Sequence, residues 1–203
     1  MKEMISIIGY SGHSYVCIEA AKLLNLKINS YYDLNEQSYN PYSLKYLGEE
    51  SNIKTNNRLF VTIGDNNIRR RIYNELKNNN CFDDRILHPN STISSTAEIQ
   101  QMSFIGAGAV INAFAKISHG SIINTGAVIE HESKLGAFCH ISSGAVLAGN
   151  VKVGENSFIG ANASIKQGVN IGANVIIGAG SVIIKDVPDG VTIVGNPGEI
   201  IKS

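Results

Sequence analysis

The chain has 203 residues, of which 43% are apolar, 17% charged and 7% aromatic. This composition predicts one sizeable folded domain or two small ones, each with an ordinary buried core, and excludes a disordered chain. Lys and Arg number 17, Asp and Glu also number 17, and the longest basic run is Arg69 to Arg71. The charge pattern therefore gives no support to a nucleic-acid partner.

The N-terminal apolar run ends at Gly9, so it is much shorter than a membrane span, and no small-residue cleavage site follows it. The cysteines are odd in number and widely spaced, which predicts neither a disulfide framework nor a structural zinc site. They are Cys17, Cys81 and Cys139. We therefore expect reduced thiols in a cytoplasmic protein that has no membrane partner.

Residues 1–88 are predicted to form a small α/β domain. The expected elements, in chain order, are a strand at 4–8, a helix at 14–24, strands at 28–32 and 59–63, and a helix at 68–77. A polar, tyrosine-bearing insertion occupies residues 35–57. Strands that alternate with glycine turns and helices favour a parallel, Rossmann-like sheet whose turn loops share one edge.

The loop after the first strand is a candidate phosphate site. Gly9 and Gly12 would let the backbone approach an anion at a helix N-terminus, although the third glycine of the full dinucleotide motif is missing. Asp33 follows the second strand, where a doubly wound fold places an acid that binds a ribose or base. A plain turn between strand and helix, with His13 as a surface residue at the helix start, remains an alternative.

Residues 89–203 carry a six-residue repeat in which a long aliphatic residue recurs sixteen times in succession. The repeated positions are Ile93, Ile99, Ile105, Ile111, Ile117, Ile123, Ile129, Leu135, Ile141, Leu147, Val153, Ile159, Ile165, Ile171, Ile177 and Ile183. A small or β-branched residue follows each of them four places later. This period predicts a hexapeptide β-helix with 18 residues per coil, whereas a β-sandwich would need alternation at period two.

Many hexads place glycine or asparagine directly after the aliphatic residue, and we expect these positions to be corners with positive φ. They are Gly106, Asn112, Asn124, Gly136, Gly154, Gly160, Gly172 and Gly178. Small residues in the other repeated position, such as Cys139, are expected to point into the core rather than to act as nucleophiles.

Three histidines occur in the β-helix. His119, His131 and His140 are spaced 12 and 9 residues apart, which lacks the close pair of a β-helix metal site, so no metal is expected. His131 is predicted to lie at a corner with Glu132 beside it, and an imidazole oriented by a carboxylate is suited to general-base catalysis near neutral pH. A solvated corner histidine remains the alternative, and His119 is interpreted as structural.

Several motifs together resemble one acyltransferase family. They are the loop at residues 9–13, Ile63 to Arg69, the Val-Ile-Glu-His-Glu segment at 128–132, Cys-His-Ile-Ser at 139–142 and the Val-Gly-Asn-Pro tail at 194–197. This combination is similar to the sialic-acid O-acetyltransferase and nucleotide-aminosugar N-acetyltransferase family, and within it to the UDP-4-amino-sugar N-acetyltransferases. The resemblance implies a left-handed β-helix, a homotrimer, acetyl-CoA in the groove between neighbouring helices, and a nucleotide-sugar held by the N-terminal domain.

The resemblance also implies roles for individual residues. His131 would be the proton acceptor, and Glu132 would raise its basicity. The acetyl-CoA groove would include His140, Ala161 and Ala179, and the nucleotide-sugar site would include Ser11, Gly12, His13, Asp33 and Gly64. Leu34 stands where close UDP-sugar members carry a second acid, so the nucleotide is left open.

We therefore hypothesise direct acetyl transfer from acetyl-CoA to the 4-amino group of a nucleotide-linked deoxyaminosugar, with a histidine general base. The thioester is already activated, so no metal or covalent intermediate is required. O-acetylation of sialic acid or a related polysaccharide sugar, and a non-catalytic trimeric scaffold, are the alternatives. The histidine aligned with His140 is often missing in the O-acetyltransferase branch, which favours an amine acceptor.

Overall fold

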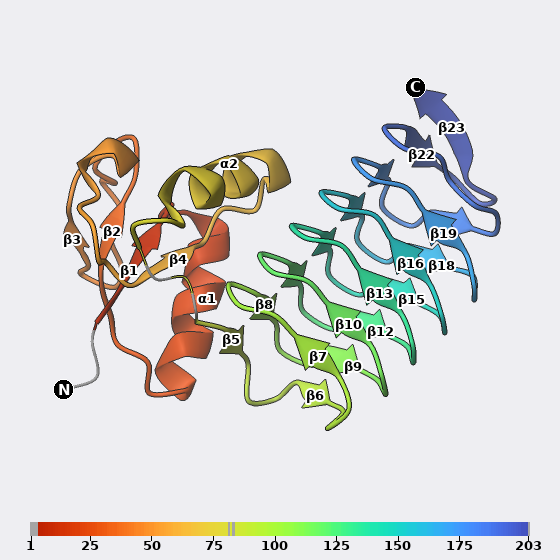
Figure 1. The fold of residues 1–203 in the computed structure, drawn as a ribbon, viewed down its shortest axis with the longest axis horizontal. Coiled ribbons are helices and arrows are strands. Elements are labelled where there is room, and N and C mark those ends of the chain that lie inside the picture. The colour runs from red at the N-terminus through yellow and green to blue at the C-terminus, as the bar shows by residue number, and fades with distance from the viewer. Residues whose placement is uncertain (1–3, 81, 83, 203) are drawn as a thin grey trace.

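The structure is a computed structural model that describes residues 4–80, 82 and 84–202. Figure 1 shows a small α/β region at one end of a β-helix, with the C-terminus at the far end. The α/β region contains β1 (Ile5–Ile8), α1 (Gly12–Leu23), β2 (Ile28–Tyr32), β3 (Lys45–Tyr46), the 3₁₀ turn η1 (Glu50–Asn52), β4 (Leu59–Val61) and α2 (Asn66–Leu76). Cys81 lies outside the described residues.

The α/β region has a parallel sheet with strand order β3-β2-β1-β4. The predicted α/β arrangement is thus confirmed, and β3 is an additional short strand inside the polar insertion. Helices α1 and α2 lie on the side of this sheet that faces the β-helix (Figure 1). Gly9 ends β1 with a φ of 89°, and a side chain there would collide with Ile63, so this turn requires glycine.

The β-helix is built from short parallel strands that stack 18 residues apart, as in the pairing of Ile122 with His140. Its first strands are β5 (Ile86–Leu87), β6 (Thr92–Ile93), β7 (Glu98–Ile99), β8 (Phe104–Ile105), β9 (Val110–Ile111), β10 (Lys116–Ile117), β11 (Ile122–Ile123), β12 (Val128–Ile129) and β13 (Lys134–Leu135). They continue with β14 (His140–Ile141), β15 (Val146–Leu147), β16 (Lys152–Val153), β17 (Phe158–Ile159), β18 (Ser164–Ile165), β19 (Asn170–Ile171), β20 (Ile176–Ile177) and β21 (Val182–Ile183). A hairpin of β22 (Thr192–Val194) and β23 (Glu199–Lys202) closes the far end.

The core of the β-helix follows the six-residue repeat. The aliphatic residue of each hexad points inward and is buried or partly buried, and the small residues such as Ala127 and Cys139 fill the remaining space between coils. Identical positions stack, so a continuous column of side chains is buried that no single coil could bury. The predicted hexapeptide β-helix is confirmed, and Cys139 packs in the core as expected.

The expected positions of positive φ are wrong by two residues. Positive φ occurs three places after the aliphatic residue, for example at Gly108, Gly126 and Glu132, and none of the predicted glycines has it. Glycine is required at Gly106 and Gly136 for a different reason: a Cβ there would lie 2.8 Å and 2.5 Å from the backbone nitrogen of the next coil. Close approach of successive coils, rather than chain reversal, therefore selects glycine after the aliphatic residue.

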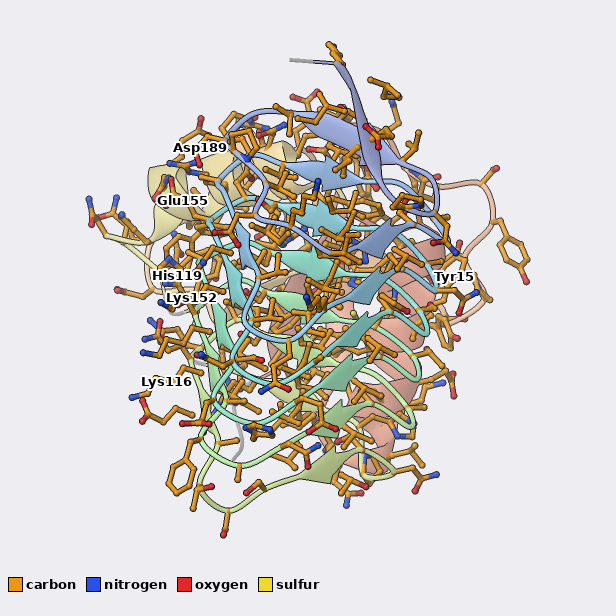
Figure 2. All side chains as sticks on the ribbon, turned by 90° about the vertical axis from the view of Figure 1, so that its right-hand side faces the viewer. Tyr15, Lys116, His119, Lys152, Glu155 and Asp189 are labelled. Carbon is orange, nitrogen blue, oxygen red and sulfur yellow. The ribbon has the colours of Figure 1, made fainter. Side chains whose placement is uncertain are left out.

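The β-helix has three sheets around one interior, and the side chains that they present outward differ. The five-stranded sheet presents a charged column, whose Lys116 and Lys152 project outward in Figure 2. The six-stranded sheet presents mostly valine: Val110, Val128, Val146 and Val182 occupy its outward positions. The eight-stranded sheet presents Phe104, Ile122, His140, Phe158 and Ile176, and the α/β region covers the first part of this column.

A buried arginine joins the two regions. Arg69 of α2 is 1% exposed, and its guanidinium makes five hydrogen bonds. It donates to the carbonyls of Ile63 and Gly64 in its own region and to those of Gly120 and Phe138 in the β-helix, and the fifth acceptor is the side chain of Asn66. All five N–H donors of the guanidinium are therefore satisfied across the junction.

Candidate active site

A pocket of about 360 Å³ lies at the carboxyl edge of the α/β sheet, and two of the predicted nucleotide-sugar residues line it. Ser11 precedes α1, whose N-terminus has no side-chain cap, and Asp33 follows β2. The Asp33 carboxylate accepts hydrogen bonds from the backbone N–H groups of Tyr10 and Leu34, at 2.9 and 2.8 Å. A helix N-terminus beside a positioned acid at this edge is suited to a nucleotide.

The other residues predicted for that site are not among those that line this pocket. Gly12 is the first residue of α1, and His13 points to the junction with the β-helix, where its ring packs edge-on against Phe104 with 5.2 Å between centroids. Burial is the main cause that lowers the pKa of His13 to about 3, and electrostatic interactions with His140 and Arg69 act in the same direction. His13 is therefore a neutral packing group in this structure, 6.3 Å from the His140 ring between centroids.

A second pocket, of about 440 Å³, lies between the α/β region and the β-helix. Its walls include Gly64 and the asparagines that begin α2 on one side, and His140, Asn156 and Phe158 on the other. Gly64 therefore borders this pocket rather than the one around Asp33. The two pockets adjoin the same α2 segment, since Ile68 and Arg71 line the first and Asn66 and Asn67 line the second.

His140 is held in one tautomer at the second pocket. Its Nδ1 lies 3.2 Å from the Gly64 carbonyl, which can only accept a hydrogen bond, so Nδ1 carries the proton and Nε2 is left as an acceptor. Burial and the charge of Arg69 lower the pKa of His140 to about 4. The imidazole is therefore neutral at physiological pH, and its acceptor nitrogen Nε2 lies 3.5 Å from the side-chain amide nitrogen of Asn124.

His131 occupies the opposite kind of environment. It lies at the corner between β12 and β13, as predicted, with its side chain 50% exposed. Its Nδ1 lies 3.0 Å from the Glu132 carboxylate, so Nδ1 donates and Nε2 is free to accept a proton. Glu132 has a φ of 62°, which turns the chain at the corner and places the two side chains together. This is the geometry of an imidazole base oriented by an acid.

The other predicted groove residues lie across the valine column from His131. Ala161 and Ala179 occupy the corners that follow β17 and β20, where the chain passes from the eight-stranded to the six-stranded sheet. His131 follows β12, where the chain leaves the six-stranded sheet. Within one chain the structure therefore sets the base at one edge of this face and the two alanines at the other.

His119 is a structural residue, in agreement with the sequence interpretation. Its ring packs at a tilt against Tyr73 of α2 and edge-on against Phe138 of the β-helix, with centroids 5.2 and 5.0 Å away. In the described residues, no three His, Cys, Asp or Glu side chains gather in a way that could hold a metal ion. No helix in that part of the chain is long and apolar enough to cross a membrane.

Known families and structures match this architecture over its whole length. The PglD N-terminal domain family matches residues 4–76, and the bacterial transferase hexapeptide family matches residues 132–167 and 150–185. A comparison with curated protein sequences finds no match. The acetyltransferase domain of PglB from Neisseria gonorrhoeae, solved with acetyl coenzyme A, is 33% identical with a TM-score of 0.89, and the match covers 98% of this chain and 99% of that one.

PerB from Caulobacter crescentus, solved with CoA and GDP-perosamine, is also 33% identical, with a TM-score of 0.89 and 98% of each chain covered. The chain belongs to the nucleotide-aminosugar N-acetyltransferase family with hexapeptide repeats. WeeI from Acinetobacter baumannii shares the fold of this family at 21% identity and a TM-score of 0.87, with 98% of this chain and 100% of that chain covered.

Family membership and geometry together show what the sequence interpretation missed. Arg69 was only part of a motif in the sequence, yet it is the residue that joins the two regions. In the sequence Arg69 is one of three consecutive arginines, and its neighbours Arg70 and Arg71 form ion pairs with Glu155 and Glu50 in the structure. Nothing in the local pattern distinguishes a buried arginine from two exposed ones.

Proposed function

We propose that this protein transfers the acetyl group of acetyl-CoA to the 4-amino group of a nucleotide-linked deoxyaminosugar, with His131 as general base. The observation that carries the proposal is the exposed His131–Glu132 pair, in which Nδ1 is engaged and Nε2 is free. Two relatives support the proposal: PglB was solved with acetyl coenzyme A, and PerB was solved with CoA and GDP-perosamine.

The proposed reaction needs few groups because a thioester is already an activated acyl donor. The sugar nitrogen attacks the thioester carbonyl carbon while His131 Nε2 takes the proton that this nitrogen loses. The carbon–sulfur bond then breaks, the amide forms, and the imidazolium returns its proton to the leaving thiolate. Glu132 holds the tautomer and stabilises the transient positive charge on the ring. Proximity of the two substrates supplies much of the remaining acceleration.

The nucleotide-sugar is proposed to bind with its nucleotide in the pocket around Ser11 and Asp33. Its sugar would then extend past Gly64 towards the β-helix. In this arrangement residues 1–88 hold the acceptor and residues 89–203 hold acetyl-CoA, with His140 offering its Nε2 as an acceptor in the acetyl-CoA groove. The adjacency of the two pockets along α2 supports this division.

We further propose that the active form is a homotrimer in which each active site lies between two chains. His131 and the Ala161–Ala179 corners occupy opposite edges of one face, so a head-to-tail contact with a second copy would bring them together. The outward valines of that face, with Val146 37% exposed, are the apolar surface that such a contact would cover. The free thiols of Cys17 and Cys139 fit a cytoplasmic location.

The test of the activity is release of free CoA from acetyl-CoA in the presence of UDP-, dTDP- and GDP-linked 4-amino sugars, with free and CMP-linked sialic acid as controls. We expect release with one aminosugar and a product heavier by one acetyl group. NMR of the product then shows whether nitrogen or oxygen carries the acetyl group. Release with sialic acid alone would replace this proposal by O-acetylation, and acetyl-CoA binding without turnover on any sugar would favour a scaffold.

A further inference from the structure

Gly149 of the β-helix has neither a positive φ nor a neighbouring backbone atom that an added side chain would meet. Many of the glycines have positive φ, among them Gly126 and Gly144, and others with ordinary φ would place a Cβ against the backbone of the next coil, as at Gly136. Gly149 belongs to neither group. A Cβ at Gly149 would lie 2.5 Å from Cε1, 2.5 Å from Nε2 and 3.2 Å from Cδ2 of His131.

The contact follows from the register of the coils. Gly149 lies 18 residues after His131, so it occupies the same corner one coil further along. Two backbone hydrogen bonds fix this stacking: Asn150 N–H donates to the His131 carbonyl at 2.8 Å, and Gly168 N–H donates to the Gly149 carbonyl at 3.0 Å. The imidazole therefore lies in the space that a side chain at residue 149 would fill.

The ring of His131 is consequently fixed on two sides. Glu132 holds Nδ1 at 3.0 Å, and Cε1 and Nε2 lie 2.5 Å from the position that a Cβ on Gly149 would take. Without the second restraint a half-exposed imidazole could rotate away from the orientation that Glu132 selects. Catalysis by a base depends on this orientation, because a misplacement of about 1 Å can cost about 100-fold in rate.

We propose that Gly149 is a positioning residue for the general base, whose missing side chain creates the seat in which the His131 imidazole lies. The inference rests on the proposed function, since it gives Gly149 a role only through His131. It also predicts which part of the protein a substitution of Gly149 displaces. The atoms that a Cβ would meet belong to the end of a side chain rather than to the backbone, so the ring moves and the coil stays in place.

The experiment is a double-mutant cycle of Gly149→Ala and His131→Ala in the full chain, measured as kcat and KM on the responsive aminosugar. We expect Gly149→Ala to lower kcat by about 10- to 100-fold with little change in KM for acetyl-CoA. In the His131→Ala background it should have no further effect, because the seat has no occupant. The matched control is Gln167→Ala, an exposed residue at the same corner one coil further along.

A second readout is independent of turnover. The imidazole proton resonances of His131, assigned by their loss in His131→Ala, should shift in Gly149→Ala and remain in place in Gln167→Ala. Unfolding temperatures of all variants should agree within a few degrees. Full activity of His131→Ala would overturn the proposed function itself. If His131→Ala is inactive but Gly149→Ala keeps full activity, only the role of Gly149 is overturned. The same conclusion follows if Gly149→Ala lowers activity by an equal factor in both backgrounds.

Discussion

The eight-stranded and six-stranded sheets of the β-helix are made by the same repeat and have the same kind of interior, but their outer faces are used differently. The α/β region of the same chain covers the start of the first, and no part of the described chain covers the second. His140 lies on the covered face and is 9% exposed, whereas the His131 side chain at the edge of the other is 50% exposed.

The two environments give one residue type two different properties within nine positions of the chain. Burial beside Arg69 keeps His140 neutral, and the Gly64 carbonyl fixes its tautomer, so it can only offer Nε2 as an acceptor. His131 has a carboxylate partner on Nδ1 and a half-exposed side chain, so its Nε2 is accessible to a substrate. The repeat sets which face each histidine joins, and the face sets the chemistry.

The largest effect is expected at the exposed histidine. His131→Ala should lower kcat by about 10²- to 10⁴-fold, which is the usual contribution of a general base. Its unfolding temperature should stay near that of the parent protein, because the lost side chain lies at a solvated corner. Steady-state kinetics with acetyl-CoA and the responsive aminosugar measures kcat, and circular dichroism measures the unfolding temperature. A large loss of stability would mean that the two histidines are less different than their environments indicate.

The next effect concerns the junction that creates the covered face. Arg69→Met removes five hydrogen bonds and leaves buried carbonyls without donors, at about 1–3 kcal/mol for each one that stays dry. We expect the free energy of unfolding to fall by at least about 3 kcal/mol. Urea denaturation of the purified protein measures it. Arg70→Met, which breaks only an exposed ion pair with Glu155, is the control and should cost less than about 1 kcal/mol.

Lowering the pH should reveal the burial of His13 and His140 as a loss of folding stability. His13 and His140 have folded pKa values of about 3 and 4, below the unfolded value of 6.5, so the unfolded chain binds more protons as pH falls below 6.5. Stability is therefore complete above pH 6.5 and declines below it, by up to about 1.4 kcal/mol per pH unit for each histidine. Thermal unfolding between pH 7 and 5 measures this slope. His140→Gln should make it shallower, and an unchanged slope would contradict the assigned burial.

The smallest effect on a single chain is expected on the uncovered face. Val146→Asp adds a charge to the valine column, and it should leave folding almost intact while weakening the proposed trimer. Sedimentation velocity over a range of protein concentrations distinguishes trimer from monomer. Lys134→Ser, at the equivalent outward position of the charged column, is the matched control. A trimer that survives Val146→Asp would place the contact on another face.

The sequence predicts most of what the repeat controls. A strict six-residue period identifies which residues of the β-helix point inward, and it locates the corner that presents His131. It fails for contacts between distant segments: no local pattern shows that Arg69 or His13 faces the β-helix. It also misplaces the positive-φ positions, because glycine was selected at Gly106 and Gly136 by the neighbouring coil rather than by the chain's own turn.

The outward residue of each hexad makes no contribution to the buried column, and this has an evolutionary consequence. Mutations of the outward residues on the six-stranded, five-stranded and eight-stranded sheets should have nearly independent effects. Each of these sheets faces different surroundings, and none of the outward residues lies in the interior of the β-helix. Assembly, solubility and substrate docking can therefore diverge separately among descendants of one gene while the same scaffold persists. Gly149 departs from this modularity, because an added side chain there would meet the His131 ring one full coil away.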